Sequence, residues 1–113
     1  LSGRADDMLV IRGVNVFPTQ IEEVLLKVDE IGPHYEILVE RKNRLDVMTI
    51  TVELIDDRLL DSYAKLSELE ARIKSALKSQ LGLATQIRLV APNSLKRFEG
   101  KAKRVTDLRK DGL

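Results

Sequence analysis

A basic segment that contains a glycine lies near the C-terminal end and is the first candidate for chemistry. It spans residues 96–104, of which five are lysine or arginine. The pair Gly100-Lys101 is similar to the end of a phosphate-binding loop, and a cluster of basic residues could also contact the phosphates of a single-stranded nucleic acid. A solvated basic loop is the alternative. A P-loop is excluded, since Leu95 and Ala102 stand where that motif requires Gly and Ser or Thr.

The first stretch of the chain, residues 1–23, is the second candidate. It reads LSGRADDMLVIRGVNVFPTQIEE. The acidic pair Asp6-Asp7 precedes an apolar run, and Arg12-Gly13 separates that run from a second extended piece. Two apolar runs around a glycine predict a β-hairpin with Gly13 at its tip. The acidic pair by itself is also ordinary turn chemistry.

Other reactive side chains are scarce, which excludes several kinds of site. The chain has no cysteine, so thiolate chemistry and disulfides are excluded. His34, the one histidine, is expected to be a surface or half-packed turn residue beside Gly32-Pro33, because no second histidine or cysteine could join it at a metal site. No Ser-His-Asp set can be assembled. Only four aromatic residues are present, so the stacking platform of a single-stranded RNA site is not expected.

Length and composition indicate one ordinary globular domain. The chain has 113 residues, of which 43% are hydrophobic, enough for a modest core. The net charge of +1 supplies no bulk electrostatic reason to expect a nucleic-acid or anionic-membrane partner. No apolar run approaches the length of a membrane span, and no signal peptide opens the chain, so a cytoplasmic location is the default expectation.

Two helices are predicted from apolar residues that recur at helical spacing. Thr19 and Glu22 have the spacing of a capping box, and residues 21–28 follow with one apolar stripe, which Gly32-Pro33 is expected to end. A longer helix is predicted over about residues 59–81, with Gly82 as its C-terminal cap. Its apolar face is formed by Leu66, Leu69, Ile73, Ala76 and Leu77.

Strands are predicted where apolar and polar residues alternate. Residues 35–40 and 48–54 show a period of two, and residues 42–44 between them form the natural turn of an antiparallel hairpin. Residues 85–90 form a third strand. The expected fold is therefore α+β: an N-terminal β-hairpin, then a two-layer domain with a three-stranded, mainly antiparallel sheet covered by two helices. Residues 93–104 are expected to be an exposed loop.

The two candidate segments together resemble motifs of the adenylate-forming superfamily, which includes acyl-CoA synthetases. The first segment is similar to the signature at the crossing from the large N-terminal domain to the small C-terminal lid. The matching residues are Gly3-Arg4-Ala5-Asp6-Asp7-Met8-Leu9, followed by Arg12-Gly13, Val16, Pro18 and Ile21-Glu22. Gly100-Lys101-Ala102-Lys103-Arg104 resembles the last motif, Gly-Lys-x-x-Arg. Residues 12–18 and 32–35 look most like the phenylacetate–CoA ligase group of aryl-CoA ligases. The resemblance covers essentially the whole chain.

The resemblance implies a lid domain over residues 1–113, with residues 1–7 as the hinge region and the N-terminal adenylation domain absent. Such ligases convert phenylacetate, ATP and coenzyme A to phenylacetyl-CoA, AMP and diphosphate. Lys101 matches the adenylation lysine, Arg4 an arginine that reaches ATP, and Asp6 the pivot of the lid. Gly13 and Arg12 belong to the CoA-side hairpin, where Arg12 contacts either substrate phosphates or only solvent.

The implied cofactors are ATP, coenzyme A and Mg²⁺, bound mainly with the absent domain, and no residue of this chain is assigned to a metal. The implied partners are that adenylation domain and a small aromatic carboxylic acid, with a homodimer left open and no nucleic acid or membrane. Because the chain starts in mid-motif, we expect a piece of a longer enzyme that is inactive alone. Two rivals remain: the lid of another adenylate-forming enzyme, or a stand-alone α+β regulatory or RNA-binding module.

Overall fold

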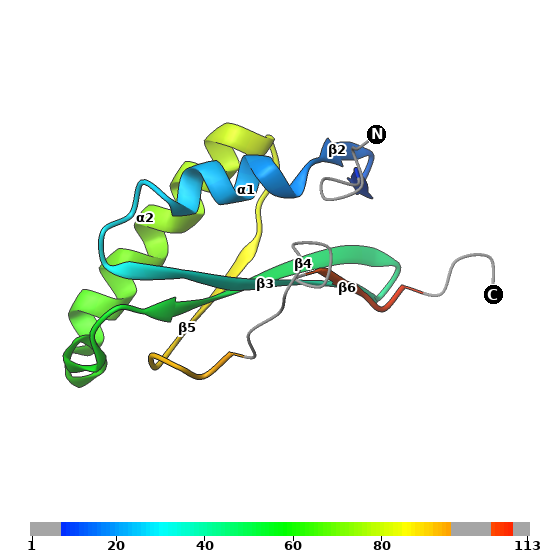
Figure 1. Ribbon diagram of the computed structural model, residues 1–113. Coiled ribbons are helices and arrows are strands. Elements are labelled where there is room, and N and C mark those ends of the chain that lie inside the picture. The colour runs from blue at the N-terminus through cyan, green and yellow to red at the C-terminus, as the bar shows by residue number, and fades with distance from the viewer. Residues whose placement is uncertain (1–7, 96–104, 110–113) are drawn as a thin grey trace.

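The computed structural model describes residues 8–95 and 105–109 (Figure 1). Predictions that concern Arg4, Asp6, Lys101, Lys103 and Arg104 therefore lie outside the described residues. The elements follow in the order β1 (Leu9–Ile11), β2 (Val14–Val16), α1 (Pro18–Leu25), β3 (Ile31–Lys42), β4 (Leu45–Leu54), the 3-10 helix η2 (Asp57–Asp61), α2 (Tyr63–Leu81), β5 (Gln86–Val90) and β6 (Val105–Asp107). The predicted α+β class is confirmed.

The main sheet has four strands in the order β5-β4-β3-β6, where three were expected. Only the central pair, β3 with β4, is antiparallel, whereas β5 pairs with β4 and β6 pairs with β3 in parallel. The sheet is thus mixed rather than mainly antiparallel. The parallel β4–β5 pair follows from the connection between them, because α2 carries the chain back along the sheet as a crossover. The three residues of β6 are too few to show a strand period in the sequence.

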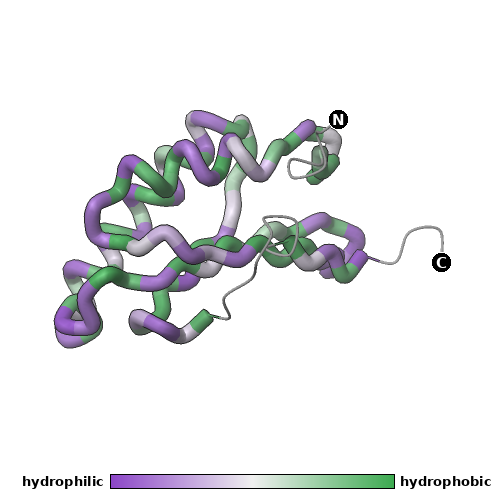
Figure 2. The backbone as a smooth tube through the Cα atoms, viewed as in Figure 1, coloured by the Kyte–Doolittle hydropathy of each residue, from purple (hydrophilic) through white to green (hydrophobic). Residues whose placement is uncertain are grey.

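Both α-helices lie on the same side of the main sheet, and the core fills the space between the layers (Figure 1). The almost completely buried residues of this core include Ile21 of α1, Ile73 and Leu77 of α2, and Ile37 and Ile50 of the sheet. Hydrophobic and hydrophilic segments alternate along both helices, as an amphipathic helix requires (Figure 2). Neither helix within the described part of the chain is long and apolar enough to cross a bilayer.

The start and end of α1 differ from the prediction. The helix begins at Pro18 with Phe17 as its N-cap, so Thr19 lies inside the first turn, not at the predicted cap position. The backbone N–H of Phe17 donates to Gln20 Oε1 at 2.9 Å, and the fixed φ of proline favours the first helical position. The helix already ends at Leu25.

The Gly32-Pro33 pair lies inside β3 and does not end a helix. Pairing of β3 with β4 is irregular between Ile31 and Tyr35, and such a bulge tolerates a proline that cannot donate to the sheet. His34 follows as a half-buried strand residue, not a turn residue.

The predictions for α2 and for the β3–β4 turn are largely confirmed. Ser62 caps α2 by accepting from the backbone N–H of Lys65, while the predicted first turn forms η2 instead. Gly82 ends the helix at φ +81°, and its N–H donates to the carbonyl of Lys78 at 2.8 Å. Asn43 and Arg44 both have positive φ, the geometry of a two-residue type I′ hairpin turn.

Candidate functional site

The β1–β2 hairpin presents the Arg12-Gly13 turn that the sequence predicts. Its strands pair antiparallel, with Leu9 opposite Val16 and Ile11 opposite Val14. Arg12 and Gly13 have φ values of +51° and +80°, so this is again a type I′ turn, and the predicted hairpin is confirmed. A Cβ added at Gly13 would meet no atom within 4 Å. The glycine therefore serves the backbone conformation, and the space beside it is open.

One face of the hairpin is part of the core and the other faces outward. The side chains of Ile11 and Val16 have no exposed surface, whereas Val10 is 45% exposed and Asn15 is exposed. The alternation of buried and exposed side chains is the expected period of two. Apolar packing thus attaches the hairpin to the domain and leaves its turn at the surface.

Arg12 binds the domain itself, a contact that neither predicted alternative includes. Its backbone N–H donates to Asp46 Oδ2 at 3.1 Å, and its Nε donates to the backbone carbonyl of Asp46 at 2.8 Å. A longer contact of 3.4 Å joins Nη2 to the carbonyl of Ala84. In this arrangement the guanidinium group positions the turn against β4 and against Ala84 in the connection before β5, and a role toward coenzyme A stays a prediction.

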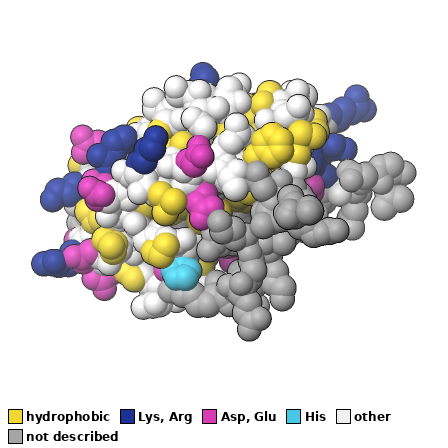
Figure 3. Space-filling view, turned by 45° about the horizontal axis from the view of Figure 1, so that its top comes forward, with side chains coloured by type: hydrophobic (Ala, Val, Ile, Leu, Met, Phe, Trp, Pro, Cys, Tyr) yellow, Lys and Arg dark blue, Asp and Glu magenta, His cyan; other side chains and the backbone are white. Residues whose placement is uncertain are grey.

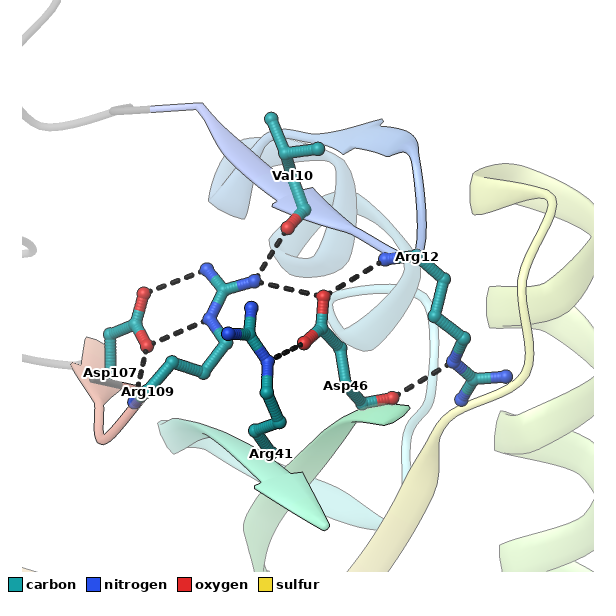
Figure 4. A network of polar contacts seen from close by, with 6 residues as sticks. All are labelled: Val10, Arg12, Arg41, Asp46, Asp107 and Arg109. Atoms are coloured by element: carbon teal, nitrogen blue, oxygen red, sulfur yellow. Dashed lines mark hydrogen bonds and ion pairs between the residues drawn. The ribbon is translucent and has the colours of Figure 1, made fainter. Parts of the chain in front are cut away.

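Asp46, just inside β4, is the centre of a network of arginines (Figure 4). Arg41 Nε lies 3.0 Å from Oδ1, and Arg109 Nη1 lies 3.1 Å from Oδ2. The same Nη1 donates to the carbonyl of Val10 in β1 at 2.6 Å, and Nη2 pairs with Asp107 at 2.8 Å. With side chains only 13% and 10% exposed, Asp46 and Arg109 join β1, β4 and the end of β6.

Hydrogen bonds, and then neighbouring charges, keep this cluster ionised. The backbone N–H of Arg12 is the main reason that the pKa of Asp46 lies below its usual value, and Arg41 and Arg109 add to the effect. The hydrogen bond from Arg109 likewise lowers the pKa of Asp107, and it raises the pKa of Arg109. Shifts that favour the charged form are typical of structural ion pairs, whereas a general acid or base needs a pKa near the working pH. The cluster is therefore suited to positioning rather than to proton transfer.

The flanks of the basic segment 96–104 are also held by the described domain. On one side the backbone N–H of Leu95 donates to Glu53 Oε2 at 2.8 Å, and Glu53 is only 4% exposed. On the other side β6 begins at Val105 opposite Ile37, and the N–H of Leu108 donates to the carbonyl of Val39. The strand before the segment is β5 and the strand after it is β6, and these are the two edge strands of the main sheet.

A small hollow lies beside Arg12. It has a volume of about 170 Å³ and is lined by Arg12, Val47, Met48, Ala84, Thr85 and Gln86. Within the described residues, the buried hydroxyl of Thr85 has no hydrogen-bond partner.

No group of three or more His, Cys, Asp or Glu side chains that could hold a metal gathers in residues 8–95 and 105–109. On the face in Figure 3, acidic and basic side chains of the described residues are interspersed.

Sequence reasoning found the turn but missed the residues that position it. Asp46 lies 34 positions from Arg12 and 63 from Arg109. No local pattern marks partners so far apart, since an acidic residue at the start of a strand is ordinary surface chemistry. The one usable signal is that Arg12 belongs to the motif that resembles the adenylate-forming signature. This predicts a functional role for Arg12 but does not identify the residue that it contacts.

The chain belongs to the family of AMP-binding enzyme C-terminal domains, whose family model matches residues 13–109. It is 42% identical to the phenylacetate-coenzyme A ligase of Escherichia coli K12, over 96% of this chain and 25% of that protein. It is 44% identical to the phenylacetate-coenzyme A ligase of Pseudomonas putida over the same shares. The chain thus spans about a quarter of the length of these curated relatives.

A solved structure shows the same fold as a separate domain. A domain of phenylacetate-coenzyme A ligase from Bacteroides vulgatus is similar with a TM-score of 0.85 and 39% identity, over 96% of this chain and 98% of that one. A 2-hydroxyisobutyryl-CoA ligase in its thioesterification state is similar with a TM-score of 0.83 and 31% identity, over 93% of this chain and 22% of that one. The predicted resemblance to the adenylate-forming enzymes is thereby confirmed.

Proposed function

We propose that this chain is the C-terminal lid of an AMP-forming aryl-CoA ligase that acts on phenylacetate. The observation that carries the proposal is the match, nearly end to end, to a domain of phenylacetate-coenzyme A ligase. The curated relatives bear the same name over 96% of this chain. The partner in the reaction is an N-terminal adenylation domain, which holds most of the sites for ATP, coenzyme A and the acid, and Mg²⁺ accompanies ATP.

Lys101 serves the first step of the proposed reaction. The phenylacetate carboxylate attacks the α-phosphorus of ATP, the bond to the diphosphate oxygen breaks, and phenylacetyl-adenylate forms. Two anions meet in this step, so an ammonium group between them offsets repulsion and stabilises the charge of the transition state. Arg4 binds ATP beside it. Both residues are assigned by the motifs they match, since they lie outside the described residues.

The Arg12-Gly13 turn serves the second step. The thiol of coenzyme A loses its proton and attacks the acyl carbonyl, and AMP leaves. The lid turns about Asp6 between the two steps, which withdraws Lys101 and brings the hairpin to the reacting groups. The open space beside Gly13 supports this role, because a pantetheine arm could pass close to the backbone there.

The half-reactions of the full-length enzyme test the proposal. Lys101→Ala should lower phenylacetate-dependent exchange of diphosphate into ATP by about 10²-fold or more, the usual scale for losing one preorganised charge donor. Thioester formation from supplied phenylacetyl-adenylate should stay near the wild-type rate. Lys103→Ala is the control and should change neither step much. Equal losses in both half-reactions would contradict the role of Lys101.

A second candidate is the lid of a related acyl-CoA ligase with a different acid. It is favoured by the similarity to 2-hydroxyisobutyryl-CoA ligase, at 31% identity. Because the acyl pocket is assigned to the other domain, this chain does not select the acid. Acid-dependent diphosphate exchange with phenylacetate and with 2-hydroxyisobutyrate would separate the two candidates.

A further inference from the structure

The hairpin that carries the Arg12-Gly13 turn is held to the domain by a polar contact set centred on one carboxylate. We propose that Asp46, together with Arg109, is the positioning residue that sets the orientation of this turn for thioester formation. This inference rests on the proposed function, because it assigns Asp46 to the second half-reaction. Asp46 is not assigned to any contact with a substrate.

The contacts fix the backbone of the hairpin at two points, Val10 in β1 and Arg12 in the turn. Within the described residues, four hydrogen bonds join the hairpin to the rest of the chain, and three of them end on Asp46 or Arg109. Arg109 Nη1 reaches the Val10 carbonyl and Asp46 Oδ2 at once, at 2.6 and 3.1 Å (Figure 4). The backbone at Ile11 is thus held on both sides, by its neighbours Val10 and Arg12.

The carboxylate also supports a backbone conformation that is unfavourable for arginine. Arg12 has φ +51°, in the left-handed region that non-glycine residues seldom occupy. Its N–H donates to Asp46 Oδ2, so the negative charge stabilises this N–H in the position that the turn requires. Without the charge, the turn keeps its apolar anchor but loses the contact that selects its orientation.

The apolar and the polar contacts of the hairpin have different roles: the apolar contacts keep it attached to the domain, and the polar contacts set its orientation. Ile11 and Val16 are fully buried and keep the hairpin attached when the polar contacts weaken. Asp46→Asn keeps the shape of the side chain but presents an amide group to the arginines. The expected result is a hairpin that is still docked but less well oriented.

Small errors in orientation matter most in a step that depends on alignment. A misplacement of about 1 Å can cost roughly 10²-fold in rate. For Asp46→Asn in the full-length enzyme we expect kcat/KM for coenzyme A, with supplied phenylacetyl-adenylate, to fall about 10-fold or more on this scale. Diphosphate exchange should change less than about twofold, because the proposed first step does not use the hairpin.

A matched control exists on the same domain. Asp56 pairs with Arg58 at 2.7 Å, the same chemistry, but in the connection between β4 and α2 and away from the hairpin. Asp56→Asn should leave both half-reactions unchanged. Asp46→Glu keeps the charge and should recover part of the loss. Arg109→Gln removes the contact to Val10 and serves as the second variant if Asp46→Asn does not fold.

Hydrogen exchange of the full-length enzyme supplies a readout that does not depend on the reaction. Backbone amides of residues 9–16 should exchange faster in Asp46→Asn than in wild type, and those of α2 should be unchanged. Equal slowing of both half-reactions, no slowing of either, or unchanged exchange in the hairpin would overturn the inference. If the wild-type enzyme forms no thioester from phenylacetyl-adenylate, the proposed function fails, and the exchange result alone then decides whether Asp46 positions the turn.

Discussion

At the scale of single residues, the hydroxyl of Thr85 is buried near Arg12 and has no hydrogen-bond partner among the described residues. A buried hydroxyl without a hydrogen bond costs free energy, so Thr85→Val should leave the free energy of unfolding unchanged or raise it by up to about 1 kcal/mol. Urea unfolding of this chain measures the change.

Thr49 supplies the control for that substitution. Thr49 is equally buried, but its hydroxyl lies 3.4 Å from Gln86 Oε1 and can donate to it. Thr49→Val should therefore be less favourable than Thr85→Val. A clear loss of stability in Thr85→Val would mean that a bound water satisfies the hydroxyl.

The cluster around Asp46 acts at the scale of elements, since it joins β1, β4 and the end of β6. The pKa values of Asp46 and Asp107 are lowered in the folded chain, so the folded chain takes up protons less readily than the unfolded chain. The stability that these carboxylates contribute is fully present above their unfolded pKa, near the ordinary value of 3.8, and is lost as the pH falls through the lower folded values.

The pH dependence of unfolding tests this cluster. Between pH 6 and pH 2, measured by urea unfolding, wild type should lose stability mainly below about pH 4. Asp46→Asn should start less stable at pH 6 and show a shallower decline below that pH. An identical decline in both proteins would show that the ion pairs of Asp46 contribute nothing to folding.

The hairpin turn offers a second prediction at the element scale. Gly13 and Gly82 have φ values of +80° and +81°, and an added Cβ would meet no atom within 4 Å at either position. Alanine should therefore cost a similar amount of stability at both, about 1 to 2 kcal/mol for the left-handed conformation. Only Gly13→Ala should also slow thioester formation in the full-length enzyme.

The comparison of the two alanine variants separates backbone strain from function. Thermal or urea unfolding gives the shared loss of stability, and the two half-reactions give the part specific to Gly13. If Gly82→Ala slowed thioester formation as much as Gly13→Ala, the effect would be general destabilisation and the hairpin would lose its proposed role.

At the scale of the whole molecule, the proposed function requires the lid to take two orientations. Asp6 matches the pivot, and a proline there removes rotation about φ. Asp6→Pro should slow overall formation of phenylacetyl-CoA more than it slows diphosphate exchange. Rapid-quench measurement of adenylate and thioester in one turnover checks this order. The control is Asp6→Ala, which keeps rotation about φ, since a proline at position 7 would itself restrict the backbone of Asp6. An unchanged overall rate would place the pivot elsewhere.

Much of the fold follows from local patterns. Four features were predicted because each depends on residues a few positions apart. They are the alternation in β3 and β4, the apolar stripe of α2, the glycine cap of α2 and the glycine turn after β1. The start of α1 was not, since a capping-box spacing at Thr19 competed with Pro18, whose ring favours the first helical turn. The fourth strand was missed because three residues carry no period.

The sequence by itself determined the class of fold, the hairpin and the family, since the motifs at the two ends and the periods between them are local. Only the tertiary structure decided the parallel pairing of β6 with β3 and the meeting of Arg12, Asp46 and Arg109. The physical reason is distance along the chain. Residues 34 and 63 positions apart come together because burial of the core packs the hairpin against the main sheet, in which β4 and β6 lie on either side of β3, and no local preference encodes that choice.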